Sequence, residues 1–386
     1  MANVTFPFPF PEHLLALLPE MIVAVAAMAL LLLDLFIPKG RKALTAYLAM
    51  LTAIVAACAT WQVTASEPLV AFYGYFVLDP FAALSKVLIC IAAVFGMVIS
   101  LDYMKEESHV GEYYVLMLFA MLGMMLMVSA NNFITMYLAM ELMALSIYVL
   151  VGYQRDVLRS NEAALKYFIL GALSSGMLLY GVTFLYGVTG SFDFATIGKA
   201  LASADSSAHF AVMLGLVFII AGLAFKVSMA PFHMWTPDAY EGAPTPITAF
   251  MAVGPKVAGF VIFMRILVDA LPALTHEYTM MLTWITVLTL TIGNLAAIAQ
   301  RNIKRMLAYS TIGQVGFVTL GLIAGNADGY SGILVYLVVY LFMTMGAFAI
   351  IVLMRREGIQ GELLDDFAGL AKVRPGYALA MGLMLF

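Results

Sequence analysis

The chain has 386 residues, of which 64% are hydrophobic and 11% are charged, and its mean hydropathy is +1.00. This composition excludes a soluble globular domain, and the small net charge of −4 gives no indication of a nucleic-acid partner. Apolar runs long enough to cross a bilayer recur along the whole chain. The sequence therefore predicts an all-α polytopic membrane protein surrounded by lipid.

Eleven apolar segments are predicted to span the membrane, with short polar connections between them. They are 13–36, 43–64, 79–102, 112–129, 132–153, 161–187, 208–235, 245–270, 275–299, 304–325 and 329–354. A twelfth begins at Tyr377 and stops at Phe386, which is too short to cross about 30 Å of hydrocarbon at about 1.5 Å per residue. We therefore expect the chain to be truncated in its twelfth helix. The stretch SFDFATIGKALAS, which begins at Ser191, is predicted to be a short surface helix.

The positions of lysine and arginine predict how these segments are oriented. The connections after odd-numbered segments hold thirteen basic residues, whereas the N-terminus and the connections after even-numbered segments hold only Lys199. The thirteen are Lys39, Arg41, Lys42, Lys105, Arg155, Arg159, Arg301, Lys304, Arg305, Arg355, Arg356, Lys372 and Arg374. The positive-inside rule then places the N-terminus on the outer side of the membrane.

The sequence shows no pattern typical of a cofactor site. Cys58 and Cys90 lie in apolar runs without a partner at metal-ligand spacing, so they are interpreted as small core residues. The five histidines are scattered, and the 386 residues contain no GxGxxG, Walker or CxxC motif. We therefore expect this chain to bind no cofactor or metal.

Five basic residues lie inside the predicted spans, namely Lys86, Lys166, Lys226, Lys256 and Arg265. Counted from the nearest span end at helical rise, Lys226 and Lys256 lie about 14 and about 17 Å deep. Glu141 also lies about 14 Å deep, whereas Lys166 is shallower and on the cytoplasmic side. Each charge near the midplane disfavours insertion by roughly 2.5–3.5 kcal/mol, so three of them together require a reason.

Two interpretations of these charges remain open. In the first, Glu141 and the lysines form ion pairs that only hold helices together. In the second, they form a proton path, because burial disfavours the charged form of a lysine and a nearby carboxylate favours it. A carboxylate and a lysine then act as a switch between holding and releasing a proton, and we expect Glu141 and Lys226 to interact.

Prolines accompany both midplane lysines. Pro231 and Pro255 each leave a backbone carbonyl without its helical donor, which membranes tolerate only inside protein or beside water. The stretch PFHMWTPDAYEGAPTP, which begins at Pro231, is predicted to be a cytoplasmic connection, with Trp235 in the interfacial aromatic belt. His233 would relay protons between bulk water and Lys226, or would be an ordinary packing residue.

Long stretches of the chain resemble one known family. They are EYYVLMLFAMLGMMLMVSANNFITMYLAMELMALSIYVLVGY, SNEAALKYFILGALSSGMLLYG, AFKVSMAPFHMWTPDAYEGAPTPITAFM, GPKVAGF and RNIKRMLAYSTIGQVGF. Together they resemble the antiporter-like membrane subunits of respiratory complex I, the bacterial NADH-quinone oxidoreductase, and among these its N subunits.

This resemblance implies a fourteen-helix antiporter-like fold with two inverted five-helix repeats, in which the seventh and twelfth helices are broken. Residues 1–111 would be an N-terminal three-helix segment, 112–270 the first repeat (helices 4–8), and 271–386 an incomplete second repeat. It also implies a half-channel built on Glu141, Lys226 and Lys256, with Lys166 accessory. Family members often carry histidine where this chain has Gln314, a residue that cannot titrate.

The implied function is proton translocation by a membrane subunit of complex I in the bacterial inner membrane, with its N-terminus on the periplasmic side. Other membrane subunits would be its partners, and the parent enzyme would use NADH, FMN, iron–sulfur clusters and quinone. Two alternatives remain, a subunit of a multisubunit cation/proton antiporter and a scaffold that pumps nothing. A sodium site would favour several midplane carboxylates, and only Glu141 is present, which favours protons.

Overall fold

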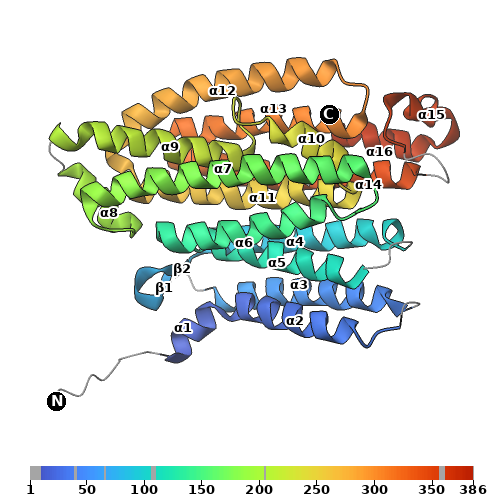
Figure 1. Ribbon diagram of the computed structural model, residues 1–386, viewed down its shortest axis with the longest axis horizontal. Coiled ribbons are helices and arrows are strands. Elements are labelled where there is room, and N and C mark those ends of the chain that lie inside the picture. Colours follow the sequence, from blue (N-terminus) through green and yellow to red (C-terminus); the bar gives the residue numbers. More distant parts are fainter. Residues whose placement is uncertain are drawn as a thin grey trace.

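The computed structural model of the chain describes residues 10–38, 41–64, 67–105, 110–203, 206–355 and 361–385. In these ranges the chain forms a bundle of long helices that run along one common direction (Figure 1). Ten of the helices found in this part of the chain are long and apolar enough to cross a membrane. The predicted all-α membrane fold is therefore confirmed.

The helices follow the predicted order closely. They are α1 (Phe10–Ala16), α2 (Leu18–Asp34), α3 (Ala43–Val63), α4 (Pro80–Tyr103), α5 (Val110–Val128), α6 (Phe133–Val151), α7 (Leu158–Thr189), α8 (Phe194–Ala202), α9 (His209–Val227), α10 (Trp235–Gly242), α11 (Thr245–Arg265), α12 (Thr275–Ile298), α13 (Ile303–Ala324), α14 (Ala327–Met354), α15 (Leu370–Val373) and α16 (Pro375–Leu385).

Polar side chains mark the starts of several of these helices. Asp79, Asn132 and Asn302 each accept a hydrogen bond from a backbone N–H in the first turn of the helix that follows, which stabilises that helix end. Asp193 caps α8 in the same way, and this helix is the predicted short surface helix. Its apolar residues Phe194 and Ile197 are buried, so it packs against the bundle through one face.

The N-terminal segment contains a small sheet that the sequence analysis did not predict. Strands β1 (Leu69–Ala71) and β2 (Phe76–Leu78) pair antiparallel between α3 and α4, with Leu69 opposite Leu78. The two strands are only three residues each, too short for their alternation to stand out from an apolar sequence. The hairpin lies at one end of the bundle, near α1 (Figure 1).

Helix α11 is the centre of the molecule. All 21 of its residues are buried, and it packs against α4, α5, α9 and α14. Pro255 lies inside α11 without ending it. This helix carries Lys256, so that lysine is surrounded by protein on every side.

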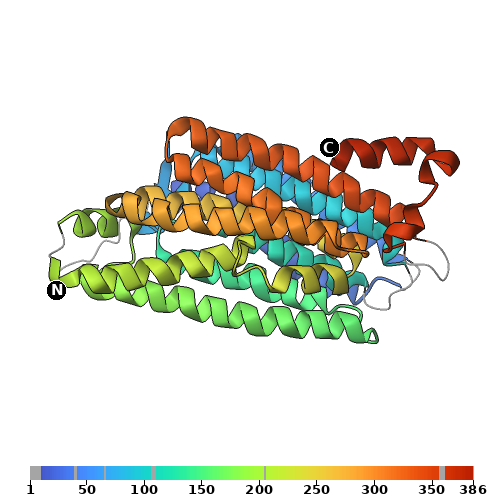
Figure 2. The ribbon, with the colours of Figure 1, turned by 90° about the horizontal axis from the view of Figure 1, so that it is seen from above.

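The seventh predicted span is the clearest difference between sequence and structure. We predicted one span over 208–235 followed by a cytoplasmic connection, but α9 ends at Val227 and a second helix, α10, covers Trp235–Gly242. Helix α7 packs against both pieces, which follow one another along the same side of the bundle (Figure 2). The expected break in the seventh helix is therefore confirmed, while the prediction of a loop over 235–242 is wrong.

The connections after the odd-numbered predicted spans, which hold the basic residues, lie together at the end of the bundle where α15 lies, opposite the hairpin (Figure 1). Lys39, Arg356 and Phe386, which entered the predictions, lie outside the described residues. Lys304 was counted with the loop residues, but it is only 1% exposed at the start of α13.

Candidate functional site

The break between α9 and α10 is closed by hydrogen bonds within the protein. Ser228 adopts a left-handed backbone conformation with φ of 72°, which ends α9. Two carbonyls at that end accept bonds from the next turn, from Ser228 N to Phe225 O at 3.1 Å and from Met229 N to Ala224 O at 2.8 Å. Trp235 Nε1 also donates to Phe225 O at 2.9 Å. These bonds satisfy the Ala224 and Phe225 carbonyls within the protein, as a membrane interior requires.

Lys226 lies in the last turn of α9, directly before this break, and is 5% exposed. Glu141 of α6 is the acidic residue that acts on it electrostatically. No ion pair within 4.0 Å joins these two described side chains. Glu141 instead accepts a hydrogen bond from the Ser175 hydroxyl of α7. Glu141 and Lys226 therefore make no direct contact in the structure, and their interaction stays a prediction.

Lys256 is 1% exposed, and its ammonium donates to the Tyr240 hydroxyl at 2.8 Å. The same nitrogen lies 5.0 Å from the centre of the Trp235 ring, within the range of a cation–π interaction. Both aromatic partners come from α10. The short helix after the break therefore supplies the surroundings of the second midplane lysine.

Trp235 connects the surroundings of the two lysines. It is buried, so its predicted place in an interfacial aromatic belt is wrong. Its ring stacks on Tyr167 of α7 at 4.2 Å between centroids, and Tyr167 meets Tyr148 of α6 edge to face at 4.6 Å. Glu141 acts electrostatically on both tyrosines. A continuous aromatic wall thus runs from the Glu141 side of the site to Lys256.

The other two predicted site residues lie apart from this centre. The side chain of Lys166 is 46% exposed, and its ammonium pairs with Glu162 at 2.7 Å and with Asp238 at 3.0 Å. His233 is 7% exposed between α9 and α10. Among the side chains that the structure describes, no hydrogen bond or ion pair connects His233 with Lys226.

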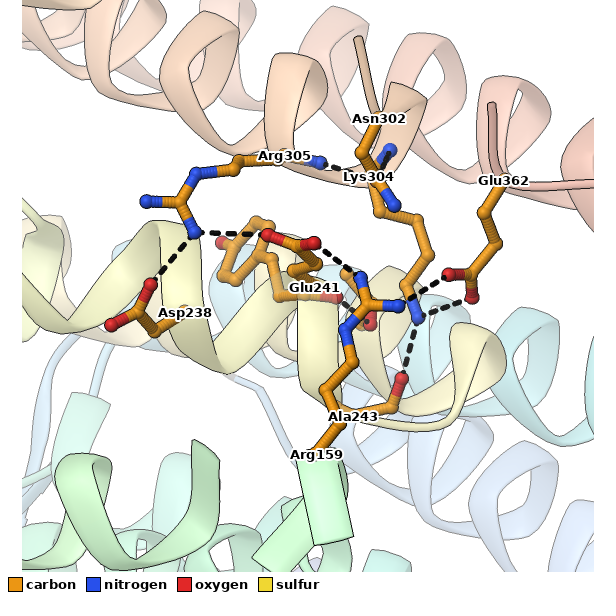
Figure 3. Close-up of polar contacts among 10 residues, drawn as sticks. Arg159, Asp238, Glu241, Ala243, Asn302, Lys304, Arg305 and Glu362 are labelled. Carbon is orange, nitrogen blue, oxygen red and sulfur yellow. Dashed lines mark hydrogen bonds and ion pairs between the residues drawn. The ribbon is translucent and has the colours of Figure 1, made fainter. Parts of the chain in front are cut away.

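Charged residues cluster at the outward face of α10 (Figure 3). Arg305 of α13 reaches Asp238 at 2.7 Å and Glu241 at 2.9 Å, and Arg159 of α7 reaches Glu241 at 2.5 Å. Lys166 joins through Asp238. We call these five residues the α10 ion-pair cluster. They line an open polar cavity with about 530 Å³ of empty space.

A buried branch extends this cluster. Lys304 donates to the backbone oxygen of Ala243 at 2.7 Å and pairs with Glu362 at 2.9 Å, and Glu362 also meets Arg159 at 3.3 Å (Figure 3). The branch fastens the junction between α10 and α11 to the start of α13. Helix α10 is therefore held from outside by charges, while its inner face holds Lys256.

The sequence analysis missed Tyr240 as the partner of Lys256. A signal for it was present in the stretch WTPDAYEG, where Trp235, Thr236, Ala239 and Tyr240 recur at helical spacing and the acidic residues fall on the other face. That pattern predicts a short amphipathic helix with an aromatic inner face. The four prolines of the stretch 231–246 concealed it, because they favour a loop.

Comparisons with known proteins agree with this geometry. The family model described as NADH:quinone oxidoreductase/Mrp antiporter, TM matches residues 130–386. The chain is 44% identical over 380 residues to NADH-quinone oxidoreductase subunit N of Thioalkalivibrio sulfidiphilus, covering 98% of this chain and 79% of that protein. It is 45% identical over 378 residues to the subunit N of Paramagnetospirillum magneticum, covering 97% and 77%.

Solved structures are similar as well. A chain of respiratory complex I from Thermus thermophilus with bound aureothin has a TM-score of 0.76 and 31% identity, covering 95% of this chain and 78% of that one. A chain of the Mrp complex from Dietzia sp. DQ12-45-1b has a TM-score of 0.82 at 23% identity, covering 96% and 70%. The second likeness concerns the fold alone.

Proposed function

The chain belongs to the family of NADH-quinone oxidoreductase N subunits, which are antiporter-like membrane proteins, and we propose that it translocates protons as a membrane subunit of complex I. As such it is a member of an enzyme complex. Electron transfer from NADH to quinone takes place elsewhere in that complex, and the energy released drives proton movement through this chain.

One observation carries the proposal. Two lysines from different helices, Lys226 and Lys256, are both almost fully buried near the break in the seventh span, and a single carboxylate, Glu141, acts on the first of them. Desolvation disfavours the charged form of a buried amine, and a carboxylate nearby favours it. The carboxylate of Glu141 acts on only one of the two buried lysines. When this effect on Lys226 changes, a proton can therefore move.

We assign the roles as follows. Glu141 is the carboxylate that biases Lys226, which is the switch, and Lys256 receives the proton farther along the membrane plane. Lys166 is accessory, because it lies in the α10 ion-pair cluster, where its exposed ammonium and three neighbouring carboxylates gather protons from water. His233 relays protons between water and Lys226 through motion at the break.

Redox cofactors belong to the other subunits in this proposal. An iron–sulfur cluster is held by about four cysteine thiolates, and this chain has two cysteines, one buried and one exposed. NADH, FMN, iron–sulfur clusters and quinone are therefore used elsewhere in the complex. The chain lies in the bacterial inner membrane beside other membrane subunits, with its N-terminus on the periplasmic side.

The test of this function is the pair of variants Lys226→Ala and Lys226→Arg in the assembled complex. We expect both to lose NADH-driven proton translocation in inverted membrane vesicles while the complex still assembles. Alanine removes the titrating group, and Glu141 can then become neutral rather than remain as an unpaired buried charge. Arginine keeps the charge but does not release its proton in a protein.

The matched control is Lys199→Ala, which removes an exposed lysine on α8 and should leave translocation unchanged. If the chain were only a scaffold, Lys226→Arg would preserve the electrostatic attraction to Glu141 and pump like the unmutated protein. Near-normal pumping by Lys226→Arg would therefore overturn the proposed switch.

A further inference from the structure

Hydroxyl groups continue from Lys256 into the second half of the bundle. We propose that Tyr240, Thr311 and Tyr340 form a hydroxyl relay that carries protons between Lys256 and a polar cavity beside α13 and α14. The inference rests on the proposed function, because it takes Lys256 as a proton carrier. It adds three residues from three helices to the path.

The groups of this relay are buried, and its first and last steps follow short hydrogen bonds. Lys256 Nζ donates to Tyr240 Oη at 2.8 Å, and Tyr340 Oη lies 2.9 Å from Thr311 Oγ1. Helix α10 packs against α13, and the step between Tyr240 and Thr311 requires side-chain motion, because no hydrogen bond joins these two described side chains. Exposure of the three side chains is 0% for Tyr240, 3% for Thr311 and 4% for Tyr340. Hydrogen-bonded hydroxyls enclosed in this way can exchange protons with one another and not with bulk water.

The far end of the relay opens into a cavity. Thr311 and Tyr340 line a small space of about 30 Å³ together with Ser310, Gln314 and Thr344. Since a cavity needs roughly 10–15 Å³ of such volume to hold one water, this space can hold a water, and the polar groups among its lining residues supply hydrogen-bond partners. Protons that reach Tyr340 therefore have an acceptor on the other side.

Gln314 stands in this cavity, where it cannot hold a proton by titrating. It accepts a hydrogen bond from the Tyr336 hydroxyl of α14, so its side chain is fixed at the cavity wall. A path along this side of the molecule must then pass through groups that conduct by exchange. The hydroxyls of Thr311 and Tyr340 are groups of that kind.

The position of Thr311 in α13 corresponds to the position of Glu141 in α6. It lies nine residues after Asn302, which caps α13, and Glu141 lies nine residues after Asn132, which caps α6. Both cap residues form an isolated antiparallel bridge farther along the chain, Asn132 with Asp193 and Asn302 with Leu363. Thr311 therefore stands at the position in its own helix where α6 carries the carboxylate.

The transfer conserves atoms and charge. Lys256 gives a proton to Tyr240 Oη, which gives its own hydroxyl proton to Thr311 Oγ1, and Thr311 passes its proton to Tyr340 Oη. Tyr340 releases a proton to water in the cavity, and the hydroxyls then rotate back. No electrons move, and each hydroxyl ends neutral, so a tyrosinate does not accumulate. The Tyr340 hydroxyl also donates to the Ala252 backbone oxygen at 3.2 Å. This oxygen is a second acceptor toward which the hydroxyl hydrogen can point during that rotation.

The experiment removes single hydroxyls at nearly constant volume, with Tyr240→Phe, Thr311→Val and Tyr340→Phe in the whole complex. We expect NADH-driven proton translocation in inverted vesicles to fall at least about tenfold for each, because a positioned proton-transfer group contributes typically about 10²–10⁴-fold. Assembly of the complex should be retained. Thr311→Ser restores the hydroxyl and should return translocation close to the unmutated rate.

Two variants control for the loss of a buried hydroxyl as such. Thr319→Val alters a buried threonine of the same helix whose hydroxyl donates only to the Val315 backbone oxygen. Tyr278→Phe alters a buried tyrosine outside the relay. Both should pump normally. Equal losses in the controls, or a loss with Thr311→Val that Thr311→Ser does not restore, would show that the hydroxyls serve packing and would overturn the relay.

The outcome for Lys226→Ala separates this inference from the proposed function. If Lys226→Ala stops pumping while the three hydroxyl variants pump normally, the relay is wrong and the proton-path function stands. If Lys226→Ala itself pumps normally, the proposed function fails, and the relay fails with it. Loss of translocation in Lys226→Ala and in all three hydroxyl variants, with both controls unaffected, is the result we expect.

Discussion

Glu20 and Lys86 form a buried ion pair to which we assign no role in transport. Lys86 of α4 is 0% exposed, Glu20 of α2 is 2% exposed, and their charged atoms are 2.6 Å apart. The Phe76 ring lies 4.7 Å from the ammonium. Unlike Lys226 and Lys256, this lysine has a carboxylate in direct contact. We interpret the pair as a fastening between α2 and α4.

We predict that Glu20→Ala destabilises the protein strongly, because it leaves the Lys86 ammonium buried without its partner. Breaking a buried pair in this way typically costs about 3–5 kcal/mol. The double variant Glu20→Met with Lys86→Met should recover most of this loss, because two apolar side chains can fill the same space. Both effects can be measured by thermal unfolding of the complex, with the amount of this chain that stays in the complex as the readout.

Removal of an exposed ion pair is the matched control for that prediction. Asp102 and Lys105 pair at 2.5 Å with side chains that are 84% and 71% exposed, so Asp102→Ala should leave the unfolding temperature unchanged. A Glu20→Ala variant as stable as the unmutated chain would contradict the assigned role, and so would a double variant that is no more stable than the single one.

At this scale the sequence could select the charged residues of the proposed site but could not predict their contacts. Depth along an apolar segment was enough to select Glu141, Lys226 and Lys256, because charge in hydrocarbon is rare. The contact between Lys256 and Tyr240 depends on the direction that the chain takes after the break at Ser228. That direction is set by packing of α10 against α7 and α13, which a single sequence does not record.

Two helix pairs of the bundle are built alike. A Cβ atom at Gly123 of α5 would approach the Met143 nitrogen of α6 to 2.5 Å, and one at Gly293 of α12 would approach the Gly313 nitrogen of α13 to 2.5 Å. Each glycine lies nine residues before the asparagine that caps the next helix. These matching features support our proposal of a first five-helix repeat over 112–270 and an incomplete second repeat over 271–386.

Close approach of backbones at these glycines leads to a prediction for both pairs. Gly123→Ala and Gly293→Ala should each lower the amount of assembled complex and its unfolding temperature, because the added methyl group forces two helices apart. The cost of overpacking is typically about 1–3 kcal/mol. Gly176→Ala and Gly187→Ala are controls on α7, where a Cβ would meet nothing within 4 Å.

The controls should be neutral or slightly stabilising, because alanine is a better helix former than glycine by about 1 kcal/mol. Quantitative blotting of membranes and thermal unfolding in detergent provide the comparison. If all four variants behaved alike, the close approach of the helices at Gly123 and Gly293 would not contribute to the stability of the protein.

Elements were predictable wherever hydrophobicity and length decided them. Ten predicted spans correspond to the ten long apolar helices of the described ranges, and the first corresponds to α1 and α2, divided near Leu17. Helix α10 was missed because charged residues and prolines are typical of a loop. Its aromatic inner face could be recognised only with the helices that pack against it. The β1–β2 hairpin was missed because three-residue strands carry too little pattern.

At the scale of the whole molecule, charge separates into three layers. The α10 ion-pair cluster and the basic connections lie at one end, Lys226 and Lys256 are buried inside the bundle, and beside the hairpin Asp79 pairs with Arg265 at 2.8 Å. The central layer is connected to the first by α10 and to the second half of the bundle by the proposed relay. A proton path with this layout enters at the charged end and then runs along the membrane plane.

The orientation of this layout in the membrane is the last prediction. We expect the end that bears Asp156 to face the cytoplasm and the end that bears Ser203 to face outward, because the basic residues concentrate at the first. Both residues are exposed, so Asp156→Cys and Ser203→Cys can be labelled separately in a chain in which Cys58 and Cys90 are replaced by alanine. A membrane-impermeant maleimide should label Asp156→Cys only in inverted vesicles and Ser203→Cys only in spheroplasts.

The chain without cysteine should take no label, and detergent should make both introduced cysteines reactive, which controls for access. The reverse labelling pattern would contradict the positive-inside assignment. It would also change the mechanism, because Lys166 and the carboxylates of Asp238 and Glu241 would then face outward. In the proposed path these groups collect protons before Lys226 receives them, so the side on which they lie decides from which compartment the protons are taken.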